Sequence, residues 1–288
     1  MTEKLFLGID GGGTSCRARL CNGDGQVLGE GLTGIANPRF GLVQACNNIL
    51  SATRQALQEA DLQEDDMQRI VAGFGLAGIN HINDRNAVMQ WGFPFASLVM
   101  RSDAYTACLG AFDGANGSIL IMGTGSCGFW IRDDESGSVG GWGFPVSDHA
   151  SGARLGLDAL SYALRAHEGI VPGTSLCSAL MAHFDHSPEE VIAWQTHALP
   201  RDYGAFTPVI FDYADKKDSL AIQLLQTAAE DAAAMIRALL DRGVEHCALV
   251  GGISSFIRPW LPETLLRYIV EPKGDALSGA LIMAQDGQ

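Results

Sequence analysis

A carboxylate followed by glycines and a threonine is the clearest candidate for chemistry in this 288-residue chain. Residues 5–9 form an apolar run of strand type that leads into Asp10. Four loop residues follow: Gly11, Gly12, Gly13 and Thr14. Glycines can take the positive φ of a sharp turn and let backbone N–H groups converge on an anion. A carboxylate repels a phosphate, so Asp10 would hold Mg²⁺ through water. A hairpin turn capped by Asp10 is the alternative of equal weight.

The residues after this loop distinguish it from a P-loop. A P-loop continues with Gly-Lys-Ser/Thr and a helix. Here residues 15–20 alternate in polarity as a strand does, and a polar turn follows at residues 22–25. The sequence therefore predicts a phosphate loop inside a β-hairpin.

The same order of segments returns about a hundred residues later. Residues 118–122 read as a strand, residues 127–132 as a second strand and residues 133–137 as a turn. Between the strands lies a second glycine loop, made of Gly123, Thr124, Gly125 and Ser126. The repeat predicts a protein of two duplicated lobes, with two unrelated hairpins as the less favoured alternative. The loop also fits G-x-G-x-x-G, but a strand follows it instead of a helix, which argues against NAD.

Three further segments could contribute to a site. Asp103 follows a strand expected at residues 97–101, where a helix N-cap is the ordinary role of an aspartate. A loop with glycines, an aromatic ring and a carboxylate suits a sugar, and contains Gly140, Gly141, Trp142 and Asp148. A packing turn with Asp148 as an N-cap is the alternative. Near the end, a strand at residues 246–250 leads into Gly251 and Gly252. His183 and His186 lack a third ligand, so we expect them at the surface.

The remaining segments predict an α/β fold of mixed sheets with flanking helices. Further strands are expected at residues 26–32 and 69–77. Helical periodicity is found at residues 40–60, 80–91, 104–112, 151–166, 175–184, 188–197, 219–242 and 274–284. We expect an N-terminal lobe over residues 1–114 and a C-terminal lobe with helical insertions over residues 115–288. The last helix is a candidate to pack back on the first lobe.

Composition excludes several classes of protein. The formal net charge of −14 argues against nucleic acid and anionic membranes as partners. No apolar run approaches the ~18–20 residues of a membrane span, and Asp10 interrupts the apolar segment that a signal peptide would need. Seven cysteines without a C-x-x-C pair suggest free thiols in a reducing compartment, so we expect a cytoplasmic protein. The oligomeric state stays open, with a homodimer as the candidate assembly.

Taken together, the loops resemble those of sugar kinases in the actin, Hsp70 and hexokinase superfamily. The likeness is greatest to bacterial glucosamine kinases and N-acetylglucosamine kinases of the BadF/BadG group, and it covers the whole chain. Five segments carry it in order: residues 8–14, residues 102–104, residues 123–126, residues 140–143 with 147–148, and residues 250–253. The resemblance implies a two-lobed, duplicated ribonuclease H-like fold of the actin-like ATPase type.

The resemblance also implies roles for these residues. The two glycine loops would hold the ATP phosphates from lobes that close around them, with Asp10 orienting Mg²⁺ and residues 251–252 passing under the adenosine. Asp103 would be the general base that accepts the proton of the sugar hydroxyl. Asn37 and Asp148 would bind sugar hydroxyls, and residues 140–143 would lie near the substituent at C2 of the sugar.

We therefore expect ATP-dependent phosphorylation of an amino sugar on its 6-hydroxyl, with glucosamine ahead of N-acetylglucosamine. His149 stands where animal-type N-acetylglucosamine kinases carry a glutamate, which leaves the identity of the amino sugar open. A dehydratase-activating ATPase of this superfamily would need cysteines paired for an iron–sulfur cluster. A sugar sensor of the same fold would usually need a DNA-binding module. These two remain as alternatives.

Overall fold

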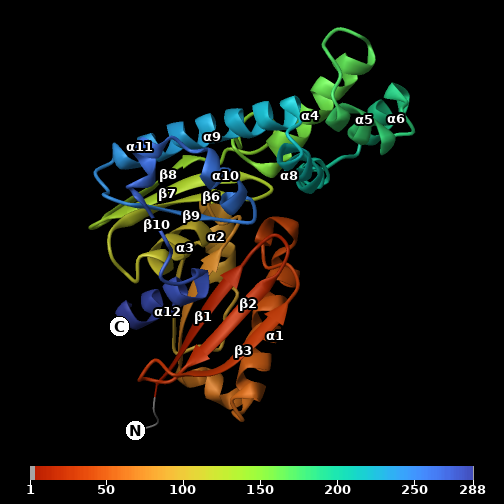
Figure 1. The fold of residues 1–288 in the computed structure, drawn as a ribbon. Coiled ribbons are helices and arrows are strands. Elements are labelled where there is room, and N and C mark those ends of the chain that lie inside the picture. The colour runs from red at the N-terminus through yellow and green to blue at the C-terminus, as the bar shows by residue number, and fades with distance from the viewer. Residues whose placement is uncertain (1–3, 288) are drawn as a thin grey trace. The chain divides into compact units, whose positions relative to one another are not determined.

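The computed structural model describes residues 4–287, which divide into two compact units (Figure 1). The first unit contains residues 4–117, 130–136 and 271–287, and the second contains residues 118–129 and 137–270. No helix between residues 4 and 287 is both long and apolar enough to cross a bilayer.

The first unit is built on a five-stranded sheet in the order β3-β2-β1-β4-β5. Its strands are β1 (Leu5–Gly11), β2 (Cys16–Cys21), β3 (Val27–Thr33), β4 (Ile70–Leu76) and β5 (Ser97–Ser102). The first three strands are antiparallel, and β4 and β5 run parallel to β1. Strand β4 is buried along its whole length, as expected for the middle of a sheet that helices cover.

Helices cover both faces of this sheet, and glycines let them approach it closely. The helices are α1 (Leu42–Glu59), α2 (Ile82–Met89), α3 (Asp103–Ala111) and α12 (Ala276–Asp286), with 3₁₀ turns η1 (Pro38–Phe40) and η2 (Glu64–Arg69). Helix α1 packs on β2 and β3, whereas α12 packs on β1, β4 and α3. A side chain at Gly73 would collide with the backbone of Ala280, and one at Gly279 with the backbone of Thr106. The apolar core of the unit lies around Leu7, Ile9 and Phe74.

The second sheet repeats the strand order of the first. Read from one edge it is β8-β7-β6-β9-β10, and its first three strands are consecutive in the chain, as in the first sheet. The strands are β6 (Gly117–Met122), β7 (Ser126–Arg132), β8 (Glu135–Gly140), β9 (Cys247–Val250) and β10 (Ile269–Val270). This repetition confirms the duplicated fold that the two glycine loops predict.

Most helices of the second unit lie between β8 and β9. They are α4 (Gly152–His167), α5 (Ser175–Ala182), α6 (Pro188–Gln195), α7 (Pro200–Gly204), α8 (Thr207–Asp215) and α9 (Ser219–Leu240). After β9 come α10 (Ser254–Ile257), η3 (Arg258–Trp260) and α11 (Glu263–Leu266). Helix α9 is rich in alanine and leucine and buries one face along its length, which matches the long periodic segment in the sequence.

The structure corrects one predicted turn and adds elements that the sequence did not reveal. Residues 133–137 were expected to form a turn, but β8 already begins at Glu135. Glycine and serine are frequent in this strand, so it lacks the apolar alternation by which strands are recognised. Helices α7, α8, α10 and α11 and the two-residue strand β10 were not expected, because they are short or interrupted by proline and glycine.

Candidate active site

The carboxyl ends of three parallel strands bring two of the predicted carboxylates to one edge of the first sheet. Asp10 on β1 is level with Gly75 on β4, which is level with Arg101 on β5. Asp103 comes two residues later, at the start of α3. The carboxyl edge of parallel strands is where ligands of α/β proteins usually bind. Asp10 and Asp103 are close enough for the charge of the first to act on the second.

Asp10 is held by an arginine on the neighbouring strand. The Nη2 and Nε atoms of Arg17 lie 2.7 and 3.1 Å from Oδ2 of Asp10, so both donate to the same oxygen. Nη1 of Arg17 reaches Asp275, which caps α12, at 3.4 Å. Oδ1 of Asp10 has no hydrogen-bond partner among residues 4–287. Arg17 was not among the residues expected in the site, although the hairpin register pairs it directly with Asp10.

The first glycine loop offers backbone donors, but it does so without the positive φ that we expected. None of the three glycines has φ between +20° and +160°, so that expectation was wrong. Gly11 is needed instead for close approach, since a side chain there would touch Leu76 and Ala36. The carbonyl of Gly12 accepts from Ala36, and the trans peptide points the N–H of Gly13 the opposite way. Within the described chain, the N–H groups of Gly13 and Thr14 have no acceptor.

Asp103 is free of the capping role that was its ordinary alternative. The N-cap of α3 is Ser102, whose hydroxyl accepts from the N–H of Tyr105 at 3.2 Å. The Asp103 carboxylate accepts from the N–H of Ala104 at 2.9 Å. Burial raises the pKa of Asp103 above its usual value, and the negative charge of Asp10 raises it further, while the bond from Ala104 opposes both. A carboxylate with a raised pKa is a better proton acceptor than an ordinary surface aspartate.

Asn37 lies in the same unit, directly before η1. Its side-chain oxygen accepts from the N–H of Arg39 at 3.0 Å and so caps this turn. A side chain at Gly78, which has φ of 82°, would collide with the Asn37 amide. The loop after β4 therefore fixes the position of Asn37.

The second glycine loop presents two adjacent N–H groups. The carbonyls of Gly123 and Thr124 accept from Gly152 and Ala153, the first residues of α4, at 2.8 and 3.1 Å. Because the peptides are trans, the N–H groups of Thr124 and Gly125 point away from α4. In the described part of the chain neither has an acceptor. Converging backbone N–H groups of this kind form an anion site.

The loop predicted to bind sugar lies against this second glycine loop within the second unit. Gly140, Gly141 and Gly143 have φ between 71° and 101°, which suits a loop that only glycine can form. Trp142 is 87% exposed. One oxygen of Asp148 accepts from Gly143 at 3.2 Å, and the other would lie 2.7 Å from a Cβ at Gly125.

Asp148 is not the N-cap that the alternative required. Ser151 caps α4 by accepting from the N–H of Arg154. Burial raises the pKa of Asp148, and the hydrogen bond from Gly143 opposes this effect. Its carboxylate remains available to a ligand hydroxyl.

Gly251 and Gly252 follow β9, at the same edge as the second glycine loop. Ile121 at the end of β6 is level with Val250 at the end of β9. Gly251 has φ of 100°, and a side chain there would collide with the backbone of Met122. Gly252 has no heavy atom near the position of a Cβ, which leaves room for a ligand.

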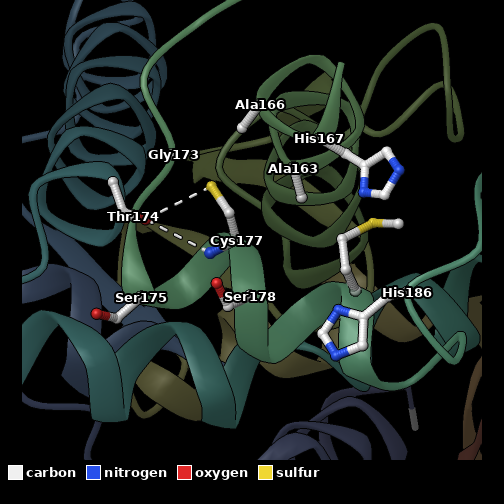
Figure 2. A pocket seen from close by; sticks show the side chains of 10 residues that line it. Ala163, Ala166, His167, Gly173, Thr174, Ser175, Cys177, Ser178 and His186 are labelled. Carbon is white, nitrogen blue, oxygen red and sulfur yellow. Dashed lines mark hydrogen bonds between the residues drawn. The ribbon is translucent and has the colours of Figure 1, made fainter. Parts of the chain in front are cut away.

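A cavity of about 570 Å³ lies elsewhere in the second unit, between α4 and α5 (Figure 2). The imidazoles of His167 and His186 lie on one side of it and the hydroxyl groups of Ser175 and Ser178 on the other. His183 and His186 are both exposed, in agreement with the surface position expected for them. None of the residues predicted to bind ATP or sugar lines this cavity.

The residues present fit a magnesium–nucleotide complex better than a metal held by protein alone. Between residues 4 and 287 no group of three or more His, Cys, Asp or Glu side chains could hold a metal ion. Mg²⁺ commonly keeps several waters and binds one or two carboxylates plus substrate phosphates. The free oxygen of Asp10, beside a loop with unpaired N–H groups, suits that arrangement.

Two mixed five-stranded sheets of equal strand order, each with a glycine loop after its first strand, define a duplicated nucleotide-binding fold of the actin-like type. The model of the BadF/BadG/BcrA/BcrD ATPase family matches residues 7–284. The chain belongs to this family of ATPases.

Individual relatives are similar over nearly the full length. The chain is 43% identical over 279 residues to the glucosamine kinase GspK of Vibrio cholerae, covering 97% of this chain and 95% of that one. It is 27% identical to an N-acetyl-D-glucosamine kinase of Dictyostelium discoideum, covering 84% and 81%. A crystal structure of a putative N-acetylglucosamine kinase from Chromobacterium violaceum matches with a TM-score of 0.90 and 33% identity, covering 98% and 99%.

Proposed function

We propose that this protein is an ATP-dependent kinase that phosphorylates an amino sugar on its 6-hydroxyl, with glucosamine as the preferred substrate. The observation that carries the proposal is that the Asp103 carboxylate does not cap α3. It lies instead at the carboxyl edge of the first sheet, where the charge of Asp10 acts on it. The 43% identity to a glucosamine kinase supports the choice of sugar.

In the proposed reaction Asp103 accepts the proton of the sugar 6-hydroxyl as the hydroxyl oxygen attacks the γ-phosphorus of ATP. The bond from the γ-phosphorus to the β,γ-bridging oxygen breaks, and ADP leaves. The raised pKa of Asp103 favours the proton transfer. Phosphoryl transfer requires mainly positioning and electrostatic stabilisation. The free N–H groups of Gly13, Thr14, Thr124 and Gly125 would supply donors for the phosphate oxygens. Gly252 would leave room for the adenosine, next to the turn that Gly251 allows.

Mg²⁺ completes the set of cofactors that we propose. The ion, when bound with ATP, neutralises charge on the phosphates. Oδ1 of Asp10 would orient it through water, while Arg17 occupies Oδ2.

Asn37 and Asp148 would bind sugar hydroxyls, and the segment with Gly140, Gly141 and Trp142 would lie near the C2 substituent. A free ammonium at C2 favours nearby carboxylates, whereas an acetamide favours apolar contacts. Trp142 is largely exposed and offers apolar contact. The carboxylate of Asp231 lies close to this segment, with its Oδ2 3.9 Å from Nδ1 of His149. These features leave both amino sugars as substrates to be compared directly.

A coupled assay of ADP release, with ATP and MgCl₂, tests the proposal on glucosamine, N-acetylglucosamine and glucose. We expect sugar-dependent turnover with the highest kcat/KM for glucosamine, and NMR of the product should place the phosphate on C6. A clear preference for glucose would contradict the amino-sugar assignment. Turnover without sugar would favour a dehydratase activator, and absence of turnover a sugar sensor.

We also propose that the protein acts in the cytoplasm. None of its seven cysteines, which all lie among residues 4–287, is in a disulfide, and six of them are buried, which suits a reducing compartment. A homodimer is the assembly to be tested, by light scattering of the purified protein.

A further inference from the structure

Ser126 is the last residue of the second glycine loop and the first residue of β7. The second glycine loop resembles the phosphate loops of sugar kinases, and this resemblance would make the hydroxyl of Ser126 a phosphate ligand. However, the side chain is only 4% exposed, and its hydroxyl donates a hydrogen bond to the backbone carbonyl of His149. This hydroxyl is therefore engaged inside the protein.

The carbonyl that Ser126 holds belongs to a strained piece of backbone. Asp148 and Ala150, on either side of His149, have φ of 62° and 61°, in the left-handed region. Residues with side chains seldom adopt this conformation and keep it only where surrounding contacts impose it. The bond from Ser126 reaches the residue between these two.

Other contacts join the same two segments. Gly152 and Ala153 donate to the carbonyls of Gly123 and Thr124, and Asp148 lies directly over Gly125. The segment that carries the sugar-binding carboxylate and the loop that offers N–H groups to phosphate are thus bonded to each other at several points.

We infer that Ser126 is a positioning residue: through the carbonyl of His149 it holds the backbone that aims Asp148 at the sugar, and it does not contact phosphate. The inference rests on the proposed function, since it takes Asp148 as a sugar ligand. The phosphate contacts of the loop are then made by the N–H groups of Thr124 and Gly125 alone.

The contacts between residues 148–153 and the second glycine loop also connect the sugar site with the phosphate site. If sugar at Asp148 orders residues 148–150, it also orders the loop to which they are bonded, so sugar should strengthen nucleotide binding. Ligands that order the same segment bind with positive coupling. Ser126 carries part of this coupling.

Equilibrium calorimetry tests the inference without turnover. Glucosamine is titrated into the protein, and ADP with MgCl₂ is titrated with and without saturating glucosamine. Ser126→Ala is compared with Ser118→Ala. Ser118 is also buried and also donates to a backbone carbonyl, that of His246 at 3.0 Å, but it lies near the opposite end of β6 from the glycine loop.

For Ser126→Ala we expect glucosamine affinity to fall about two- to tenfold, the effect of one lost buried hydrogen bond. ADP affinity without sugar should stay within about twofold of the wild-type value, and the enhancement of ADP binding by glucosamine should shrink. Ser118→Ala should match the wild type in all three measurements. In an Asp148→Asn background, Ser126→Ala should have little further effect on glucosamine, because the two residues act on one interaction.

A loss of ADP affinity in the absence of sugar, with glucosamine affinity unchanged, would show that Ser126 is a phosphate ligand and overturn the inference. Equal behaviour of Ser126→Ala and Ser118→Ala would overturn it too. If Ser126→Ala fails to fold, Ser126→Cys, which keeps a weak donor of similar size, should give an intermediate glucosamine affinity. Failure of the proposed function has a different signature: neither glucosamine nor N-acetylglucosamine binds the wild type, or Asp148→Asn binds them unchanged.

Discussion

Ser102 and Asp103 are adjacent in the sequence, and either could cap a helix. The backbone assigns the task to Ser102, which has extended φ and ψ and accepts from Tyr105. Asp103 occupies the first position of α3, where its carboxylate accepts from the N–H of Ala104 and does not cap the helix. A carboxylate at position 102 would cap the helix, whereas the carboxylate one residue later is not used as a cap.

Replacement of Asp103 by Asn should lower kcat by about 10²–10⁴-fold, because it removes the base with little change of shape. The KM for sugar should change by only a few-fold, since the amide can still accept a hydrogen bond. Steady-state kinetics in the coupled assay measure both constants. Asp65→Asn, at an exposed position in η2, is the matched control and should leave both unchanged. Near-normal kcat in Asp103→Asn would refute the assignment of the base.

The activity should also depend on the protonation of Asp103. Its pKa is raised by burial and by the charge of Asp10, so the active, deprotonated form is lost as the pH falls through a value above the usual aspartate pKa. The profile of kcat/KM against pH should therefore fall on its acid side above pH ~4. The pKa of Asp148 is raised as well, so the profile is repeated with Asp148→Asn. An acid limb that persists there belongs to Asp103, and an acid limb at or below the usual aspartate pKa would contradict the prediction.

Single residues differ in how far the sequence reveals them. Asp10 and the glycine loops stand out in the sequence because their residue types are unusual after a buried strand. Asp103 alone would read as an ordinary helix cap, and only the family resemblance implies its role as a base. Arg17 could have been found from the hairpin register, which sets it opposite Asp10. Asp275 could not, because it meets Arg17 only through packing of segments 258 residues apart.

At the scale of elements, each glycine loop works by turning its carbonyls toward the protein and its N–H groups away. In the second loop α4 receives the carbonyls, so the start of a helix orients a loop that precedes it by nearly thirty residues. Glycine is required for two different reasons here. Gly125 makes room for Asp148, whereas Gly123 has no protein atom near the position of a Cβ.

These reasons can be separated by substitution. Gly123→Ala should leave the melting temperature unchanged and raise the KM for ATP, because the added methyl group can meet only a ligand. Gly125→Ala should raise the KM for sugar, since its Cβ would lie 2.7 Å from Oδ2 of Asp148. Calorimetric melting and steady-state kinetics distinguish the two outcomes. A lowered melting temperature in Gly123→Ala, with ATP kinetics unchanged, would argue against a phosphate site at this loop.

The packing of α12 predicts a purely structural effect. Gly279→Ala should destabilise the protein by about 1–3 kcal/mol, because the backbone carbonyl of Thr106 cannot move aside as a flexible side chain could. Urea unfolding measures the change. Gly173→Ala is the control, since its nearest neighbour would be a methyl group at 4.0 Å. Equal stability of the two variants would mean that α3 and α12 can separate at little cost.

Elements with strong periodicity were predicted well, and those held by context were not. The two hairpins and helices α1, α4 and α9 follow from apolar spacing. Strand β8 has the sequence ESGSVG and forms because β7 offers it an edge. The short helices between α6 and α9 depend on the aromatic cluster around Trp194, Tyr203 and Phe206, which no local pattern reveals.

At the scale of the whole molecule, the duplication supplies two glycine loops, each after the first strand of its sheet, but the carboxylate at the end of that first strand occurs only once. Asp10 is the penultimate residue of β1, whereas the corresponding strand β6, with the sequence GSILIM, contains no carboxylate. The copies have therefore diverged in chemistry while keeping the order of their strands.

The cysteines should report on the packing of both units. Burial raises the pKa of Cys16 and of Cys247 to about 12, and most of the others are buried as well. Since the thiolate is the reactive form, a thiol reagent at neutral pH should label the native protein slowly. All seven should react quickly in denaturant. Rapid labelling of Cys16 or Cys247 in the native protein would show that its unit opens readily.

Helix α12 follows the second unit in the chain but packs in the first. A ribosome makes the β1–β5 sheet early and α12 only after some 170 further residues. Until then the face of β1 and β4 around Gly8 and Gly73 has no helix to cover it. During translation the first unit therefore keeps this face of its sheet uncovered while the second unit is synthesised. The first unit can complete its fold only after α12 has been synthesised.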